Sequence, residues 1–370
     1  MNLRIPGPTP CPPEVLAASA RQMIDHRSAE FGELLHRVTR NLQAVFQTTN
    51  DLLVLTGSGT GGMEAAIANT LSPGDPVVAV TVGAFGDRFA GIAEAYGAQV
   101  QRLAFPWGQP ADPDALREAL RAQPGTKAVL LTHNESSTGV TNDIAALAAI
   151  AHEAGALALV DSVSGLGAIP LPVDAWDLDV AVTASQKAWM SPPGLTMVSV
   201  SARAWEARKT ARMPRFYWDF GQAKSYAERG QTPWTPAVSV LYALDVALQA
   251  MLEEGIESVF ARHERVARLA REGIRRLGLS LIPDERWASN TVTAVAAPDG
   301  LDVRELRRRC REEHQVVLAG GQGQLDGKSF RIGHMGWVGE AEIQDVLQAL
   351  GAVLPAMALR QGQGGAPTRA

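Results

Sequence analysis

Short apolar runs alternate with helical patterns through the first two thirds of this 370-residue chain. Most of these runs are continuously apolar, which is typical of strands that helices cover on both faces. Strands that alternate with helices in this way predict an α/β fold with a mostly parallel, doubly wound sheet. The predicted strands are Leu52–Thr56, Pro76–Val82, Gln99–Leu103, Ala128–Thr132, Ala156–Val160 and Val180–Thr183, and the predicted helices are Met63–Leu71, Phe85–Tyr96 and Asp143–Ala154.

The pattern changes near residue 240, where one long helical region, Val238–Leu277, is interrupted at Glu254–Gly255. Short strand-like and helical segments follow, which predict a smaller C-terminal α+β domain. We expect an N-terminal arm at 1–20, a large domain at 21–245, a small domain at 246–358 and a disordered tail at 361–370, which is poor in apolar residues. The predicted segments of the small domain are Asn290–Val295, Val303–His314, the turn Gly320–Gly323, Phe330–Gly333 and Glu340–Leu354.

Composition excludes several classes of protein. The net charge of the chain is −5, so it lacks the excess of basic residues that is typical of nucleic-acid-binding proteins. No run of apolar residues is long enough for a transmembrane helix, and the proline-rich start lacks the apolar segment of a secretory signal. Two cysteines, Cys11 and Cys310, cannot form a disulfide framework or a cysteine-rich zinc site, and the histidines show no metal-binding spacing. We therefore expect a cytoplasmic enzyme of the α/β class without a metal.

A glycine-rich segment, Gly57–Gly62, joins the first predicted strand to the helix that follows. Glycines let the backbone approach an anion, and a helix N-terminus offers its free N–H groups. A dinucleotide site would need an acidic residue at the end of the next strand, and none is present there. Two interpretations of the segment stay open: an ordinary tight turn, or a cup for a single phosphate with the Ser58 and Thr60 hydroxyls as ligands.

Two ionisable residues are predicted at strand ends, where open α/β sheets bind their ligands. Asp161 directly follows a buried strand, and Lys187 lies between a buried strand and another apolar run. Taken singly, Asp161 could be a turn residue and Lys187 a surface residue. Apolar surroundings would lower the pKa of the lysine, however, as a Schiff-base nucleophile requires. Together with a phosphate cup, the two residues match the needs of pyridoxal phosphate: a phosphate site, an acid for the pyridine nitrogen and a lysine for covalent attachment.

Motifs spread over residues 6–333 occur in the order typical of one enzyme family. The sequence resembles the class V aminotransferases of pyridoxal-phosphate fold type I, in the alanine–glyoxylate and serine–pyruvate branch. It is especially similar to bacterial members called soluble hydrogenase small subunit. The most specific motif is Ser185–Lys187 followed by Pro192–Gly194, with Asp161 upstream. The other motifs are Pro6–Pro10, His26–Ser28, Gly57–Thr60, Gly83–Gly86, His133–Gly139, Asp161–Val163, Thr235–Pro236 and Phe330–Gly333.

The resemblance implies a role for each matching residue. Lys187 would form the internal aldimine with the cofactor and later move the substrate proton, while Asp161 would keep the pyridine nitrogen protonated. Val163 would pack under the cofactor ring, and Phe85 would stack over it. The remaining implied contacts are Ser136 with the ring hydroxyl, and Ser58, Gly59, Thr60 and Gln186 with the phosphate, joined by the partner subunit's Thr235 in a homodimer with shared active sites.

On the substrate side, the resemblance assigns the α-carboxylate to Arg331 and closes the site with the turn at Gly7. Arg331 could otherwise be a surface arginine on a short strand, but the planar fork of its guanidinium suits a carboxylate. Some members carry a tyrosine where this chain has Thr232, so the shorter hydroxyl is not assigned to the phosphate. His133 follows a predicted strand and is interpreted as a hydrogen-bonded strand-end histidine.

These roles predict amino-group transfer from a small L-amino acid, serine or alanine, to a small 2-oxo acid, glyoxylate or pyruvate. An aspartate aminotransferase is the main alternative. Its dicarboxylate substrate would need a second cation near the site, for which Arg27 and Lys328 are candidates.

Two further alternatives come from different protein classes. A cysteine desulfurase of the same fold type would need a nucleophilic thiol near the cofactor, and neither Cys11 nor Cys310 is suitably placed. A non-enzymatic, cofactor-bearing partner in a hydrogenase complex would not need Lys187, Asp161 and Arg331 together, and this chain has all three.

Overall fold

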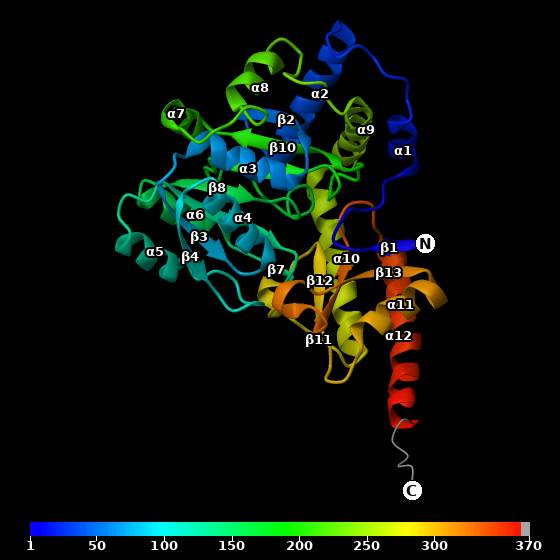
Figure 1. The fold of residues 1–370 in the computed structure, drawn as a ribbon. Helices are drawn as coiled ribbons and strands as arrows, with labels where there is room; N and C mark the ends of the chain where they lie inside the picture. The colour runs from blue at the N-terminus through cyan, green and yellow to red at the C-terminus, as the bar shows by residue number, and fades with distance from the viewer. Residues whose placement is uncertain (364–370) are drawn as a thin grey trace, which may run out of the picture.

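The computed structural model describes residues 1–363, which form two lobes built on two separate sheets (Figure 1). In the larger sheet, one strand runs antiparallel to both of its neighbours and all other adjacent pairs are parallel. The mostly parallel sheet predicted from the apolar runs is therefore confirmed. Its strand order is β2 (Asp51–Gly57), the antiparallel β10 (Gly194–Val200), β9 (Val180–Ala184), β8 (Leu157–Asp161), β5 (Ala128–Thr132), β3 (Pro76–Thr81) and β4 (Gln99–Ala104).

Helices cover both faces of this sheet. Successive residues of each strand point to opposite sides, so a continuously apolar strand has an apolar side chain to bury on each face. On one face, Val78 and Val160 belong to a core shared with α2 (Ala29–Phe46), α5 (Pro113–Ala122), α6 (Ile144–Glu153) and α9 (Val238–Glu254). On the other face, their chain neighbours Val77 and Leu159 belong to a core shared with α3 (Gly59–Thr70), α4 (Ala84–Ala95), α7 (Ala202–Thr210) and α8 (Phe220–Ala227). Because helices cover both faces, the carboxyl ends of the strands are the part of the sheet where a ligand can bind.

The smaller sheet has five strands, in the order β1 (Asn2–Arg4), β13 (Val316–Gly320), β14 (Ser329–Gly333), β12 (Val292–Ala296) and β11 (Ser280–Leu281). Its core includes side chains from α10 (Ile256–Arg276), α11 (Val303–His314) and α12 (Glu340–Gln363). The remaining short elements are the hairpin of β6 (Asn134–Glu135) and β7 (Val140–Thr141), and the 3-10 turns Glu285–Trp287 and Gly323–Leu325. No helix within the described part of the chain is long and apolar enough to cross a membrane.

The first residues of the chain connect the two lobes. β1 pairs in parallel with β13, so that the chain begins as an edge strand of the C-terminal sheet. The chain then crosses to the large lobe, where α1 (Pro13–Ser19) packs along α9 (Figure 1). Because α9 packs in the large lobe and α10 in the small one, we propose that the domain boundary lies at Gly255, between these two helices.

Two elements differ from the sequence-based expectations. α3 begins at Gly59 rather than at Met63, so most of the glycine-rich segment is the first turn of a helix. α12 continues past the expected end at Leu354 as far as Gln363, although Pro355 lies inside it. The tail predicted at 361–370 therefore begins within a helix, and its residues 364–370 lie outside the described part of the chain.

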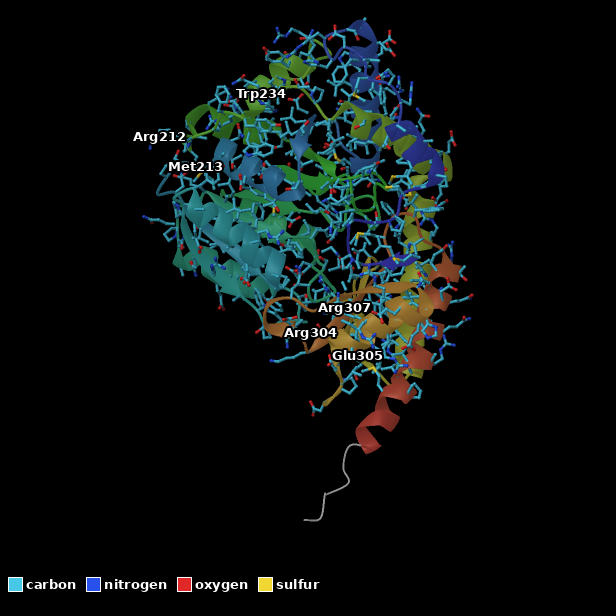
Figure 2. The ribbon with its side chains drawn as sticks, turned by 45° about the vertical axis from the view of Figure 1, so that its right-hand side comes forward. Arg212, Met213, Trp234, Arg304, Glu305 and Arg307 are labelled. Atoms are coloured by element: carbon cyan, nitrogen blue, oxygen red, sulfur yellow. The ribbon has the colours of Figure 1, made fainter. Side chains whose placement is uncertain are left out.

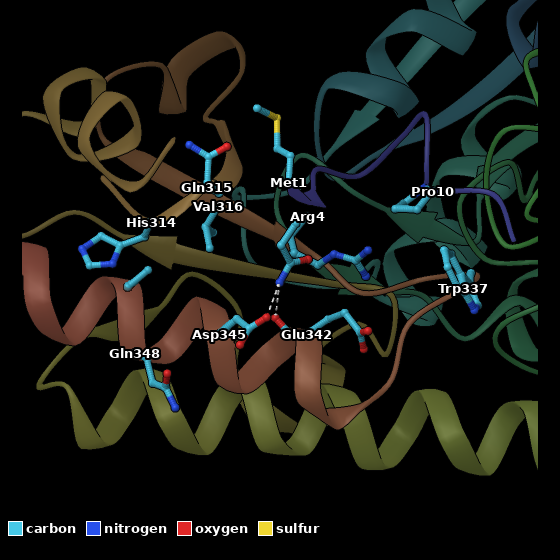
Figure 3. Close-up of a pocket in the computed structure, with 12 residues that line it drawn as sticks. Met1, Arg4, Pro10, His314, Gln315, Val316, Trp337, Glu342, Asp345 and Gln348 are labelled. Atoms are coloured by element: carbon cyan, nitrogen blue, oxygen red, sulfur yellow. Dashed lines mark hydrogen bonds between the residues drawn. The ribbon is translucent and has the colours of Figure 1, made fainter. Parts of the chain in front are cut away.

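A hollow of about 560 Å³ lies between β1 and the start of α12 (Figure 3). Arg4 lines it and is almost fully buried, and this burial lowers the pKa of its guanidinium to about 10. The negative charge of Glu342, which lines the same hollow, partly offsets this lowering of the pKa. None of the residues predicted for the site lines this hollow.

Candidate active site

Lys187 lies in a tightly held loop that follows β9. Ser185 begins this loop, and its hydroxyl donates to the Pro192 carbonyl oxygen at 2.7 Å. Trp189 is fully buried, and its indole N–H donates to the Thr183 hydroxyl at 2.9 Å. These bonds fix the loop on both sides of Lys187, so its flexible side chain leaves from a rigid backbone.

The N-terminal segment crosses directly over Lys187. The Lys187 ammonium donates to the Pro6 carbonyl oxygen at 2.5 Å, and the Thr9 hydroxyl donates to the Lys187 carbonyl oxygen at 2.8 Å. Gly7 has a φ of 131°, and a Cβ there would lie 2.7 Å from Lys187 Nζ, so a side chain at this position would be strained and crowded. The turn at Gly7 therefore lies against the lysine itself.

Asp161 is the last residue of β8 and is almost fully buried. Its Oδ1 accepts the backbone N–H of Val163 at 2.9 Å, and its Oδ2 has no hydrogen-bond partner among residues 1–363. Burial raises the pKa of Asp161 to about 6 and lowers the pKa of Lys187 to about 8. The opposite charges partly offset these shifts, because each group favours the charged form of the other.

Arg331 comes from β14 and lines a cavity of about 410 Å³ together with Lys187. Its Nε donates to the Gly320 carbonyl oxygen at 2.9 Å, and its Nη1 donates to the Ser136 carbonyl oxygen at 2.9 Å and to Gln322 Oε1 at 3.1 Å. Arg331 is thus a buried cation that no carboxylate of the described chain pairs with, and burial lowers its pKa to about 10. The other lining residues are Ile5, Pro6, Gly7, Phe85, Ser136, Arg307, Ala319, Gly320, Gly321, Gln322 and Asp326.

Glu135 holds in place the segments that contribute Phe85 and Ser136 to this cavity. Its fully buried carboxylate accepts the backbone N–H groups of Phe85 and Gly86, both at 3.0 Å. α4 has glycine, Gly83, at its N-cap, so Glu135 takes the place of a capping side chain. A Cβ at Gly83 would lie 2.5 Å from the Glu135 side chain, which explains the glycine.

The N-terminus of α3 is where the sequence predicts the phosphate. Ser58 is exposed and makes no capping hydrogen bond, and the first turn of α3 contains no acidic residue. The unpaired N–H groups of this turn and the helix dipole suit an anion. Arg88 of α4 donates to the Thr60 hydroxyl at 3.4 Å, and its guanidinium carbon lies 4.7 Å from the centre of the Phe85 ring. Arg88 therefore adds a cation beside the predicted phosphate ligands.

Close packing explains why this segment is rich in glycine. A Cβ at Gly57 or at Gly61 would lie 2.6 Å from the Trp218 ring. A Cβ at Gly59 would lie 2.5 Å from the Val163 side chain. The segment is thus a tight turn with a free helix N-terminus, so its two interpretations are compatible with each other.

Gln186 and Thr235, the remaining predicted phosphate ligands, lie in different environments. The Oε1 atom of Gln186 is buried and has no hydrogen-bond partner in the described chain. Thr235 is exposed and does not line the cavity of Lys187. The Thr232 hydroxyl donates to the Trp234 carbonyl oxygen at 2.7 Å, so it is already bonded within its own loop.

The expected second cations are not in the cavity. Arg27 donates to the Thr232 carbonyl oxygen at 2.7 Å, and Lys328 is exposed, and neither residue lines the cavity. Neither candidate for the second cation therefore lies in the cavity of this chain. Arg307, which the sequence analysis did not single out, lines the cavity instead.

The cysteines and His133 show no sign of a catalytic role. Cys310 is fully buried, and burial raises the pKa of its thiol to about 11. Cys11 does not line the cavity, and burial raises its pKa as well. His133 Nδ1 lies 2.8 Å from the Ser162 hydroxyl oxygen, and burial lowers the pKa of the ring to about 3. The histidine is therefore neutral and hydrogen-bonded.

Sequence reasoning missed three residues of this site. Arg88 lies three positions after Phe85 on α4, so helical spacing could have identified it as a neighbour. Glu135 lies inside one of the family motifs, but nothing in the spacing indicates that it caps α4. Arg307 lines the same cavity as Arg331 only because α11 packs against β13, which no local pattern reveals.

The residues present fit pyridoxal phosphate. Asp161 Oδ2 and Gln186 Oε1 are acceptors without a partner in the described chain, and Asp161 could accept from a protonated pyridine nitrogen. The unpaired start of α3 and the guanidinium of Arg88 suit a phosphate. The amine of Lys187 has a lowered pKa, as covalent attachment requires.

A doubly wound sheet that holds a buried lysine and a buried aspartate at neighbouring strand ends defines a pyridoxal-phosphate-dependent transferase of fold type I. The family model described as aminotransferase class-V matches residues 4–325. The chain belongs to the class V aminotransferases, and it is a transaminase that uses pyridoxal phosphate.

The chain is similar to named relatives along almost its whole length. It is 45% identical over 355 residues to the small subunit of a soluble hydrogenase from Synechococcus sp., which covers 95% of this chain and 92% of that one. It is 41% identical to an L-aspartate–glyoxylate aminotransferase from Paracoccus denitrificans, over 91% of this chain and 87% of the relative. A solved alanine–glyoxylate aminotransferase from Nostoc sp. has a TM-score of 0.92 at 34% identity, over 95% of this chain and 94% of that one. The family resemblance inferred from the motifs is confirmed.

Proposed function

We propose that the protein transfers the amino group of a small L-amino acid to a small 2-oxo acid, with serine or alanine as donor and glyoxylate or pyruvate as acceptor. The observation that carries this proposal is the buried guanidinium of Arg331, which lines the same cavity of about 410 Å³ as Lys187. The cofactor would take up part of this volume. The space that remains favours a substrate of few carbon atoms with one carboxylate on Arg331.

Lys187 is the proposed site of cofactor attachment and the base that moves the α-proton of the substrate. Bound pyridoxal phosphate acts as an electron sink for the charge that is left when this proton is removed. Because burial lowers the pKa of Lys187 to about 8, a larger share of its amine is neutral at physiological pH than for an ordinary lysine. The Pro6 carbonyl oxygen orients this amine at 2.5 Å.

Asp161 is the proposed partner of the pyridine nitrogen. A protonated pyridine nitrogen beside the buried carboxylate of Asp161 would favour the ionised form of that carboxylate. The carboxylate would in turn favour the protonated form of the nitrogen. Phe85 and Val163 would cover the two faces of the ring. The remaining cofactor ligands that we propose are Ser136 for the ring hydroxyl, and Ser58, Gly59, Thr60 and Gln186 for the phosphate.

Arg331 is the proposed ligand of the substrate α-carboxylate. The carbonyl oxygens of Gly320 and Ser136 hold its guanidinium at 2.9 Å each, so the fork is already positioned before a substrate arrives. A carboxylate fixed in this way orients the Cα–H bond of the substrate toward Lys187. Such orientation can lower the activation free energy by roughly several kcal/mol.

We also propose a homodimer with shared active sites, in which Thr235 binds the phosphate of the partner subunit. Thr235 is exposed, and its neighbour Trp234 (Figure 2) stacks against Phe216 at 4.9 Å and Tyr217 at 6.0 Å between ring centroids. Phe216 and Tyr217 are exposed large hydrophobic side chains. Clustered exposed aromatic rings are typical of protein–protein interfaces, which supports an interface beside Thr235.

The experiment that tests the proposed reaction is a panel of single-turnover half-reactions. The loaded enzyme is mixed with L-serine, L-alanine and L-aspartate in turn, and the conversion of the cofactor to its amino form is followed by absorbance. Serine or alanine should complete the conversion, and glyoxylate or pyruvate should reverse it. If no small amino acid converts the cofactor, the proposed reaction is wrong.

A further inference from the structure

A second guanidinium, that of Arg307, lines the same cavity as Arg331. Arg307 comes from α11 in the small lobe, where Figure 2 labels it among its neighbours on that helix. Its Nε donates to the Leu318 carbonyl oxygen of β13 at 3.0 Å. The missing side chain of Gly320 leaves room for the fork, because a Cβ there would lie 2.8 Å from Arg307 Nη1. The Arg307 side chain is thus fixed across β13 and reaches the cavity.

The two Nη atoms of Arg307 have no acceptor within residues 1–363, whereas Arg308 and Arg309 of the same helix each form a close ion pair. Arg308, the next residue, pairs with Glu305 at 2.7 Å. The one carboxylate that lines the cavity, Asp326, has its ion pair with Arg304 at 3.8 Å. Arg307 therefore lines the cavity without an ion pair to any of residues 1–363.

Two guanidiniums without an ion pair in one cavity give that cavity a positive potential, which attracts an anion. Burial lowers the pKa of Arg331, and the negative charge of Glu135 partly offsets this shift. The charge of Arg307 lowers the pKa further, so the two guanidiniums are within electrostatic reach of each other. A ligand with one carboxylate would satisfy only one of the two forks, whereas a short dicarboxylate could satisfy both.

We propose that Arg307 forms a second carboxylate subsite, so that the enzyme accepts a dicarboxylic amino acid of the size of L-aspartate in addition to monocarboxylic donors. Arg331 binds the α-carboxylate, and Arg307 binds the side-chain carboxylate. This inference rests on the proposed function, because it places the substrate in the same cavity beside Lys187.

The first test measures binding without turnover. Maleate, an unreactive four-carbon dicarboxylate, is titrated calorimetrically into the cofactor-loaded enzyme. Arg307→Gln should weaken maleate binding by about tenfold or more, because it removes a charged donor to the second carboxylate. Arg308→Gln, which makes the same change one residue further along α11, should leave binding as it is. Asp326→Asn should tighten it, because the change removes a like charge from the cavity.

The second test compares half-reactions of the same variants. Arg307→Gln should slow the half-reaction of L-aspartate by a similar factor and leave that of L-alanine nearly unchanged. Equal losses for both amino acids, or maleate binding that Arg307→Gln does not weaken, would overturn the subsite. The two proposals also fail separately. A wild type that converts alanine but binds no maleate contradicts the subsite alone, and one that binds maleate but converts no amino acid contradicts the proposed function alone.

Discussion

The side chain of Lys187 depends on its surroundings for its chemistry. The sequence places it before Ala188, Trp189 and Met190, which predicts apolar surroundings, and all three are buried. What the sequence does not indicate is the Pro6 carbonyl oxygen that accepts the Lys187 ammonium, because that contact joins residues 181 positions apart.

The lowered pKa of Lys187 predicts the pH dependence of cofactor loading. The neutral amine is the nucleophile, so the rate of covalent attachment to the cofactor-free protein should rise as the pH passes through about 8 and level off above it. Absorbance after mixing with pyridoxal phosphate measures this rate. Asp161→Asn should move the profile to lower pH, because it removes a negative charge that favours the ammonium. A wild-type rate that still rises at pH 10 or so, as for an ordinary lysine, would contradict this prediction.

Arg331 gives a prediction for the substrate carboxylate. Arg331→Lys should lower kcat/KM for every amino acid substrate by roughly 10- to 100-fold, because an ammonium cannot reproduce the planar fork that binds a carboxylate. Loading of the cofactor, read from its visible absorbance, should be retained and serves as the control. Half-reactions that are as fast in Arg331→Ala as in the wild type would show that the carboxylate binds elsewhere.

Among the elements, α4 contributes Phe85 to the cavity, and its first turn packs closely only because its N-cap is Gly83. Gly83→Ala should lower the free energy of unfolding by about 1–3 kcal/mol, because the new Cβ would collide with the buried Glu135. Gly91→Ala, on the same helix, is the matched control. Its Cβ would meet nothing closer than Arg102 Nη2 at 3.9 Å, so it should raise the free energy by up to about 1 kcal/mol.

Urea unfolding of the two glycine variants at one protein concentration measures this difference. Equal stability of both variants would mean that Glu135 can move away from Gly83 at little cost. The Gly83→Ala protein should also bind the cofactor less tightly than the wild type, because Phe85 lies in the first turn of the same helix.

Long apolar strands were predictable from the sequence, and short or long-range elements were not. The six predicted strands of the large sheet are all present within a residue or so of their expected ends. β1 has three residues and pairs with β13, more than 300 positions away, so no local pattern indicates it. α2, by contrast, carries a readable signal in its Ser28 N-cap and its apolar face, which the sequence analysis did not use.

At the scale of the whole molecule, the cavity is assembled from both lobes. Lys187 comes from the large lobe, Arg331 and Arg307 from the small one, and Gly7 from the segment between them. The sequence predicts Lys187, Asp161 and Arg331 through local motifs. It could not predict Arg307, because the position of α11 over β13 depends on the packing of the entire small lobe.

The proposed homodimer gives a prediction at the same scale. Thr235→Ala and Lys187→Ala chains should each form enzymes with low activity at limiting cofactor. A mixed dimer should regain one intact site, which combines Lys187 of one subunit with Thr235 from the other. Mixing the chains and assaying at low cofactor concentration measures this recovery, and sedimentation should give about twice 39.4 kDa. A monomer with full activity at low concentration would contradict the shared site.

Mass spectrometry after borohydride reduction shows directly whether Lys187 holds the cofactor in the cavity that Arg331 completes. Reduction fixes the cofactor to the amine that carries it. We expect one modified peptide, the one that contains Lys187, and loss of that modification in Lys187→Ala. A cofactor found on any other lysine of the wild type, or no covalent cofactor at all after reconstitution, would contradict the assignment of Lys187.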